Sequence, residues 1–186
     1  MRILAVSGSL REDSYNTSLL RAAVEAAPDG IELELWEGIG DLPLYDEDLE
    51  TGDVPESVRR LREEWGAADA ILFATPEYNG SVPGVLKNAV DWASRPKLEG
   101  VLRNKTVAVV GASTGQFGAL WAQQDLKRIL GVAGARVVGT EIPVSRAHER
   151  FDREGRLLDG EIFEQLRLHL TTLASEAVPA PDRAAA

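Results

Sequence analysis

Short apolar runs alternate with amphipathic stretches along most of this 186-residue sequence. The apolar runs have the length of strands, and the stretches between them carry apolar residues at helical spacing. Such alternation predicts an α/β protein with a doubly wound, mostly parallel sheet and right-handed helical crossovers. The expected strands are residues 2–7, 31–36, 70–75, 106–111 and 136–142, and the expected helices are residues 17–27, 55–66, 83–94, 119–130 and 161–177.

Two segments fall outside this alternation. Residues 37–54 are rich in Gly, Pro and Asp, which predicts a long irregular connection. Residues 178–186 are rich in Pro and Ala and are expected to form a frayed tail. Residues 1–177 are long enough to bury one sizeable core, so we expect a single domain there.

The charge of the chain excludes several classes of partner. Its net charge is −10, and the stretch from Ile31 to Glu56 holds ten acidic residues and no Lys or Arg. Such a chain lacks the basic stripe that binds nucleic acid or an anionic membrane surface. No apolar run approaches the roughly 20 residues that span a bilayer, and a strand begins within two residues of the N-terminus, which does not suit a signal peptide. We therefore expect a cytoplasmic protein.

Cysteine and histidine usage narrows the chemistry further. The sequence has no Cys, which excludes disulfides and thiolate catalysis. His148 and His169 lie apart and belong to no paired ligand motif, so we expect each to be a surface or packing residue. No metal site is expected.

The first unusual loop, residues 7–16, follows the first predicted strand and precedes a helix. Its backbone N–H groups, its Ser hydroxyls and the helix N-terminus favour phosphate binding, and Arg11 adds a planar, charged donor. The alternative is a connecting turn whose Ser or Asn caps the helix. The loop matches neither the Walker pattern nor the Gly-x-Gly-x-x-Gly fingerprint, because Gly8 is its only glycine.

Two further loops follow the third and fourth predicted strands. In residues 75–83, Tyr78 offers an aromatic face and Asn79 an amide, which suits a planar heteroaromatic ring; the alternative is a rigid turn with a surface tyrosine. In residues 111–118, the glycines allow close backbone approach to a flat ligand; the alternative is a turn that begins a helix. Parallel sheets bind ligands where the strand order reverses, so we expect all three loops to converge.

These loops resemble those of the flavodoxin-like NAD(P)H-dependent FMN reductases, which include bacterial quinone and chromate reductases. Residues 8–16 match Gly-Ser-Leu-Arg-x-x-Ser-x-Asn at every fixed position, and residues 76–92 match the Pro-Glu-Tyr-Asn motif and its following helix. The third loop departs at Ala119, where the family prefers glycine. The resemblance covers roughly residues 1–175. It implies a five-stranded parallel sheet of order 2-1-3-4-5 with helices on both faces.

The resemblance also implies a cofactor and an activity. Hydride would pass from NADH or NADPH to FMN, and electrons then to a quinone, free flavin or similar small molecule, with no catalytic side chain required. The FMN phosphate would be held by Ser9, Arg11, Ser14, Tyr15 and Asn16. The ribityl chain and ring would be lined by Pro76, Glu77, Tyr78 and Asn79, and the ring would be approached from its other side by Ser113, Thr114, Gly115 and Gln116.

Several alternatives stay open at this point. The resemblance implies a homodimer or homotetramer with residues 84–94 near the subunit contact, where Trp92 is either an interface or a core residue. A flavodoxin-type electron carrier would bind FMN without using NAD(P)H. A signalling receiver domain would need acidic residues where Ser7 and Thr75 stand, so these two residues argue against that class. A non-flavin phosphosugar or nucleotide binder would use the same phosphate loop.

Overall fold

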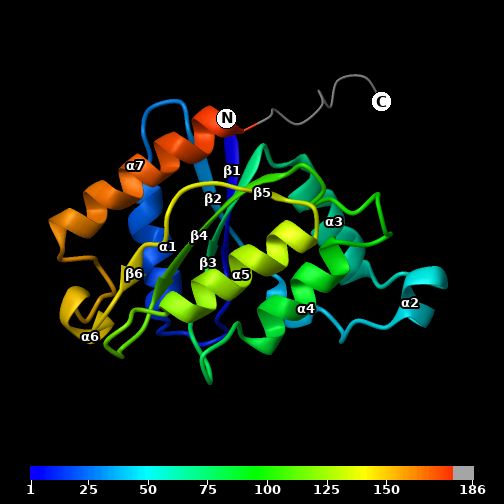
Figure 1. The fold of residues 1–186 in the computed structure, drawn as a ribbon, viewed down its shortest axis with the longest axis horizontal. Helices are drawn as coiled ribbons and strands as arrows, with labels where there is room; N and C mark the ends of the chain where they lie inside the picture. The colour runs from blue at the N-terminus through cyan, green and yellow to red at the C-terminus, as the bar shows by residue number, and fades with distance from the viewer. Residues whose placement is uncertain (178–186) are drawn as a thin grey trace.

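The computed structural model describes residues 1–177, and the predicted tail at 178–186 lies outside them (Figure 1). Its parallel sheet has the order β2-β1-β3-β4-β5, with the short β6 also paired to β4. This order confirms the doubly wound, flavodoxin-like prediction. The strands are β1 (Arg2–Ser7), β2 (Glu32–Trp36), β3 (Ala70–Ala74), β4 (Thr106–Ala112), β5 (Arg136–Val137) and β6 (Pro143–Val144).

Helices cover both faces of this sheet. They are α1 (Tyr15–Ala26), α2 (Glu47–Thr51), α3 (Glu56–Ala67), α4 (Gly84–Ala93), α5 (Leu120–Val132), α6 (Ala147–Arg150) and α7 (Gly160–Glu176), with a 3-10 turn, η1 (Ile39–Asp41). In β1, Ile3 packs in one apolar cluster with residues of α1 and α7, whereas Leu4 packs in a second cluster with residues of α3, α4 and α5. Successive side chains of a strand point to opposite faces of the sheet and so meet different helix layers. Figure 1 shows the helices on both faces of the sheet.

The central strands end at one level. Ser7 pairs with Ala74, and Ala74 pairs with Val110, across β1, β3 and β4. Just beyond, the Gly8 N–H donates to the Ala74 carbonyl at 2.8 Å. A Cβ on Gly8 would lie 2.7 Å from Leu86 Cδ2, so a larger residue at this exit from β1 would require the Leu86 side chain to move. The three unusual loops therefore leave the sheet side by side at its carboxyl edge.

The fifth strand is shorter than predicted. Only Arg136–Val137 continues the sheet, and the chain pairs with β4 again at Pro143–Val144. Between them Gly139 has a φ of 73°, and a Cβ there would lie 2.4 Å from Cε1 of the buried His169 on α7. The imidazole occupies the space that a continuous strand with side chains would need.

Two other differences concern short helices. The connection predicted to be irregular, residues 37–54, contains η1 and α2, and α6 lies in a stretch with no predicted element. No residue of α2 is buried, so it carries no apolar periodicity that a sequence pattern could show. Its first turn is stabilised by Asp46, whose Oδ1 accepts the Asp48 N–H at 2.9 Å.

The structure also decides the packing of three singled-out side chains. Trp92 is a core residue of its own chain, and its Nε1–H donates to the Pro43 carbonyl at 2.8 Å. His169 is buried in the packing between α7 and Gly139, whereas His148 is exposed. The predictions of core or surface histidines are confirmed.

Candidate functional site

The three loops line one hollow of about 130 Å³ at the carboxyl edge of the sheet. Its walls come from residues up to 105 positions apart in sequence, as the topology predicts. Asn79, Gly115 and Gln116 are exposed and do not line it. The lining residues are Ser9, Arg11, Ser14, Tyr15, Asn16, Pro76, Glu77, Tyr78, Ala112, Ser113 and Thr114.

The first loop presents the start of α1 to the hollow. Ser14 is the N-cap, and its Oγ accepts the N–H groups of Asn16 and Thr17 at 3.3 and 3.4 Å. The turn before it is held by Ser9, whose Oγ accepts the Arg11 N–H at 3.3 Å. In these bonds both serine oxygens accept, so each hydroxyl hydrogen is left to donate to a ligand.

Charge at this helix end suits an anion. The first turn of α1 contains no acidic residue. Arg11 is exposed. Within residues 1–177 its guanidinium donates one hydrogen bond, to the Asp13 carbonyl at 3.2 Å, and forms no ion pair. A guanidinium, two hydroxyls and a helix N-terminus together form a donor set that fits a phosphate.

Asn16 lines the hollow, and its side chain also makes a structural contact that the sequence does not show. Its side chain is buried, Nδ2–H donates to the Ala112 carbonyl at 3.0 Å, and Oδ1 accepts the Ala112 N–H at 2.9 Å. Both ends of the amide are thus used to join the start of α1 to the end of β4. Asn16 positions the first and third loops, and Ala112, which was not among the predicted residues, belongs to the site through its backbone.

The second loop is a tight hairpin. Tyr78 and Ser81 exchange two backbone hydrogen bonds of 3.2 Å, and between them Asn79 and Gly80 have φ of 54° and 75°. This is the geometry of a type I′ turn, for which Asn-Gly is a favoured pair. The turn leaves the Tyr78 side chain 51% exposed.

The second loop is anchored to α5. Glu77 Oε2 accepts the Ala122 N–H in the first turn of α5 at 3.1 Å, and the Ser81 hydroxyl donates to Asp125 Oδ2 at 2.6 Å. The hydrogen bond from Ser81 and those from Arg128 lower the pKa of Asp125. The N-terminus of α5 is therefore capped by a carboxylate, whereas the N-cap of α1 is the hydroxyl of Ser14.

The third loop is held from behind by the segment that contains β6 and α6. The Ser113 N–H donates to the Val144 carbonyl at 3.0 Å, and the Arg146 N–H donates to the Gly115 carbonyl at 3.0 Å. At the end of the loop the buried Ala119 has a φ of 59°. This left-handed conformation explains why glycine is favoured at this position.

Two exposed aromatic side chains lie at the start of α5. Phe117 and Trp121 are 51% and 48% exposed, and their ring centroids are 4.7 Å apart. Trp121 immediately precedes Ala122, to which Glu77 of the second loop is bonded. Neither Phe117 nor Trp121 lines the hollow, and neither is among the predicted site residues.

The sheet is parallel, and a hollow whose donors suit a phosphate lies where the strand order reverses. These two features define a flavodoxin-like cofactor-binding protein. The family model described as NADPH-dependent FMN reductase matches residues 1–149. This chain belongs to the NADPH-dependent FMN reductase family, which confirms the resemblance seen in its loops. Among residues 1–177, no helix has the length and apolarity needed to cross a membrane.

Relatives of known name support this assignment. The chain is 44% identical over 174 residues to an NAD(P)H-dependent FMN reductase of Pseudomonas aeruginosa, with 93% of each chain covered. It is 38% identical over 180 residues to an NADPH:quinone oxidoreductase of Arabidopsis thaliana, covering 93% of this chain and 90% of the other. Among solved structures, FerB, a flavoenzyme NAD(P)H:(acceptor) oxidoreductase from Paracoccus denitrificans, superposes with a TM-score of 0.85 at 35% identity, covering 95% of this chain and 99% of FerB.

Proposed function

We propose that this chain is an FMN-dependent oxidoreductase that oxidises NADH or NADPH and reduces a quinone, free flavin or a similar small molecule. The observation that carries this proposal is the convergence on one hollow, at the carboxyl edge of the sheet, of three loops that resemble those of the family, the third departing only at Ala119. The relatives named as quinone reductases favour a quinone as the acceptor.

The residues that would hold FMN fall into two groups. Its phosphate is assigned to the donor set of Ser9, Arg11, Ser14 and the backbone around Tyr15, at the N-terminus of α1. A hollow of about 130 Å³ is smaller than the roughly 300 Å³ at which pockets for whole drug-sized ligands begin. It therefore suits only part of the cofactor. The ribityl chain and flat ring are assigned to the walls formed by the second and third loops and to the exposed residues beyond them: Pro76, Glu77, Tyr78, Asn79, Ser113, Thr114, Gly115 and Gln116.

Bound FMN would supply the redox chemistry, accepting hydride from the nicotinamide and delivering electrons to the acceptor. The protein's own contribution is placement. Asn16 fixes the first loop to the third, and Glu77 and Ser81 fix the second loop to α5. The exposed Tyr78, Phe117 and Trp121 offer aromatic faces on which a planar acceptor or nicotinamide could stack.

The proposal extends to organisation and place of action. We propose that residues 1–177 work as one domain, and that the protein acts in the cytoplasm as a homodimer or homotetramer. Both sheet faces are covered by helices of the same chain, which supports the single domain.

The test is sustained nucleotide oxidation by the purified protein loaded with FMN, followed at 340 nm with NADH and with NADPH in the presence of benzoquinone. Many turnovers per protein molecule are expected. An electron carrier would consume no nucleotide, or no more than its own flavin can accept. A protein that takes up no FMN at all would instead support the non-flavin phosphate binder. Arg11→Ala serves as the matched variant: it should lose activity at low FMN concentration and recover at high concentration.

A further inference from the structure

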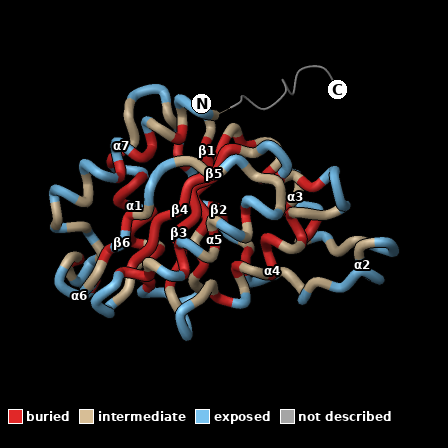
Figure 2. The backbone as a smooth tube through the Cα atoms, viewed as in Figure 1, coloured by how far each residue is buried: buried red, intermediate tan, exposed pale blue. Residues whose placement is uncertain are grey.

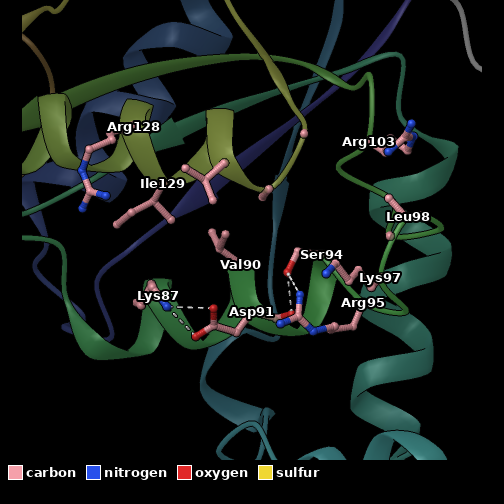
Figure 3. Close-up of a pocket in the computed structure, with 14 residues that line it drawn as sticks. Lys87, Val90, Asp91, Ser94, Arg95, Lys97, Leu98, Arg103, Arg128 and Ile129 are labelled. Carbon is pink, nitrogen blue, oxygen red and sulfur yellow. Dashed lines mark hydrogen bonds and ion pairs between the residues drawn. The ribbon is translucent and has the colours of Figure 1, made fainter.

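A larger hollow, of about 500 Å³, lies between α4 and α5 (Figure 3). Val90 of α4 and Ile129 of α5 give it an apolar floor, and the chain that follows α4 closes one side. We call it the cationic groove. Its charged lining residues are Lys87, Asp91, Arg95, Lys97, Arg103 and Arg128.

The charge of this groove is opposite to that of the whole chain. It gathers five basic side chains and one acidic one, although the net charge of the protein is −10. Lys87 pairs with Asp91 at 2.7 Å, and Arg128 pairs with Asp125 at 2.9 Å. Lys97 and Arg103 are exposed, and within residues 1–177 their side chains form no hydrogen bond or ion pair.

The rim of the groove exposes large apolar side chains. Leu98 is 69% exposed and Val132 is 83% exposed. A small anion bound to the basic side chains would leave both of these in water. A protein segment that carries acidic and apolar residues together would cover them and answer the charge as well.

The same chain carries such a segment. Residues 44–53, which we call the acidic arm, contain α2 and stand apart from the body of the protein (Figures 1 and 2). Leu44 is 83% exposed and Leu49 is 37% exposed. Glu47 and Asp48 are also exposed, and their carboxylates form no hydrogen bond or ion pair with the described residues.

The base of the arm is held firmly to α4. The Tyr45 N–H donates to Asn88 Oδ1 at 2.8 Å, and the Tyr45 ring packs edge-on against Trp92 with centroids 4.9 Å apart. Arg95, which lines the groove, donates to the Tyr45 hydroxyl at 3.3 Å. The arm and the groove therefore lie on neighbouring sides of one helix and keep a fixed spacing, although the arm is not seated in its own groove.

We propose that the acidic arm of one copy docks in the cationic groove of a second copy. A twofold axis would then repeat the contact, giving two arm–groove pairs in each dimer, as a closed isologous interface requires. Complementary charge at these two patches offsets the repulsion between two chains of net charge −10. The inference rests on the homo-oligomer of the proposed function and on no property of the flavin site.

Charge reversal tests it. Lys97→Glu with Arg103→Glu reverses the groove, and Glu47→Lys with Asp48→Lys reverses the arm. Light scattering after size exclusion should show that each reversed protein loses the mass of the wild-type dimer, because both of its contacts become repulsive. An equimolar mixture of the two proteins should recover that mass, since in the mixed dimer each arm again meets a groove of opposite charge.

The controls separate the docking from the homo-oligomer itself and from the reductase activity. Arg153→Glu, on an exposed site elsewhere, should leave the mass unchanged. Circular dichroism should show that the reversed proteins are folded. A wild-type monomer would overturn the homo-oligomer and the docking together. An oligomer that survives both reversals, or a mixture that fails to recover the mass, would overturn the docking alone, and nucleotide oxidation by the FMN-loaded protein reports separately on the reductase.

Discussion

The side chain of Asn16 forms a closed pair of hydrogen bonds with the backbone of Ala112, 96 residues away, at 3.0 and 2.9 Å. The pair is buried and stands between the first and third loops of the candidate site. The pair holds the two loops together as a backbone pair holds two strands, because each partner supplies one donor and one acceptor.

Asn16→Ala should therefore destabilise the protein and weaken FMN binding together. The change leaves the Ala112 N–H and carbonyl buried without partners, which costs about 2–4 kcal/mol in the free energy of unfolding. Urea denaturation and FMN titration measure the two effects. Thr17→Val is the matched control. Thr17 lies in the same helical turn as Asn16, and the change removes one side-chain hydrogen bond of 2.8 Å to Ser7 of β1, which should cost about 1 kcal/mol. An Asn16 variant no less stable than this control would contradict the account.

Arg11→Ala should weaken FMN binding with little effect on folding. Loss of a charge-assisted hydrogen bond to phosphate is worth about 1.5–3 kcal/mol, or roughly a ten- to hundredfold rise in Kd. The exposed guanidinium makes no ion pair within the described residues, so the midpoint of urea unfolding should hardly move. Arg21→Ala, an exposed cation further along α1, is the control. Equal FMN affinity in the two variants would remove Arg11 from the site.

Glu77→Gln should raise the reduction potential of bound FMN. The carboxylate accepts the Ala122 N–H at the N-terminus of α5 and offsets the positive end of that helix. Removing its charge while keeping an acceptor favours the more negative, reduced flavin. A helix-terminus interaction of about 0.3–1 kcal/mol corresponds to about 6–20 mV for a two-electron couple. Glu12→Gln, in the exposed part of the first loop, should shift the potential less; an equal shift would show a general charge effect.

His169 should make the fold sensitive to mild acid. Burial lowers the pKa of His169 to about 4, with a smaller contribution in the same direction from Lys127, while Glu141 opposes it. Because the folded pKa lies below the ordinary 6.5, the neutral ring contributes stability fully above pH 6.5, and this contribution is lost as the pH falls through 4. The gap corresponds to roughly 3 kcal/mol.

Urea denaturation from pH 7 to pH 4 measures this effect. His169→Gln should show a smaller loss of stability over that range than the wild type, because the variant has no group there to protonate. His148→Gln changes an exposed imidazole and should retain the wild-type pH dependence. Parallel curves for the wild type and His169→Gln would show that the acid sensitivity comes from other groups.

The sheet and the place of the site could be predicted because they depend on local patterns. Central strands such as Ala70–Ala74 are apolar throughout, and the loops that follow parallel strands meet at one edge. The convergence of Arg11, Tyr78 and Ser113 on one hollow follows from strand order alone.

Several features could not be predicted because they depend on contacts between residues far apart in sequence. The amide of Asn16 suits a phosphate as well as a backbone, and only the position of Ala112 decides between them. Likewise, the bond from Glu77 to α5 depends on a contact 45 residues away. The fifth strand ends at Val137, and the packing of His169, from the last helix, against Gly139 just beyond it depends on a contact 30 residues away. The helix α2 has no buried residue and thus no apolar pattern.

A crystal structure of the protein grown with FMN tests the central claim most directly. The account predicts the FMN phosphate within hydrogen-bond distance of Arg11, Ser9 and Ser14 at the N-terminus of α1, with the flat ring beside Tyr78 and the third loop. An empty hollow in crystals that hold FMN elsewhere, or a ring bound on the far side of β1 with no contact to these loops, would contradict it.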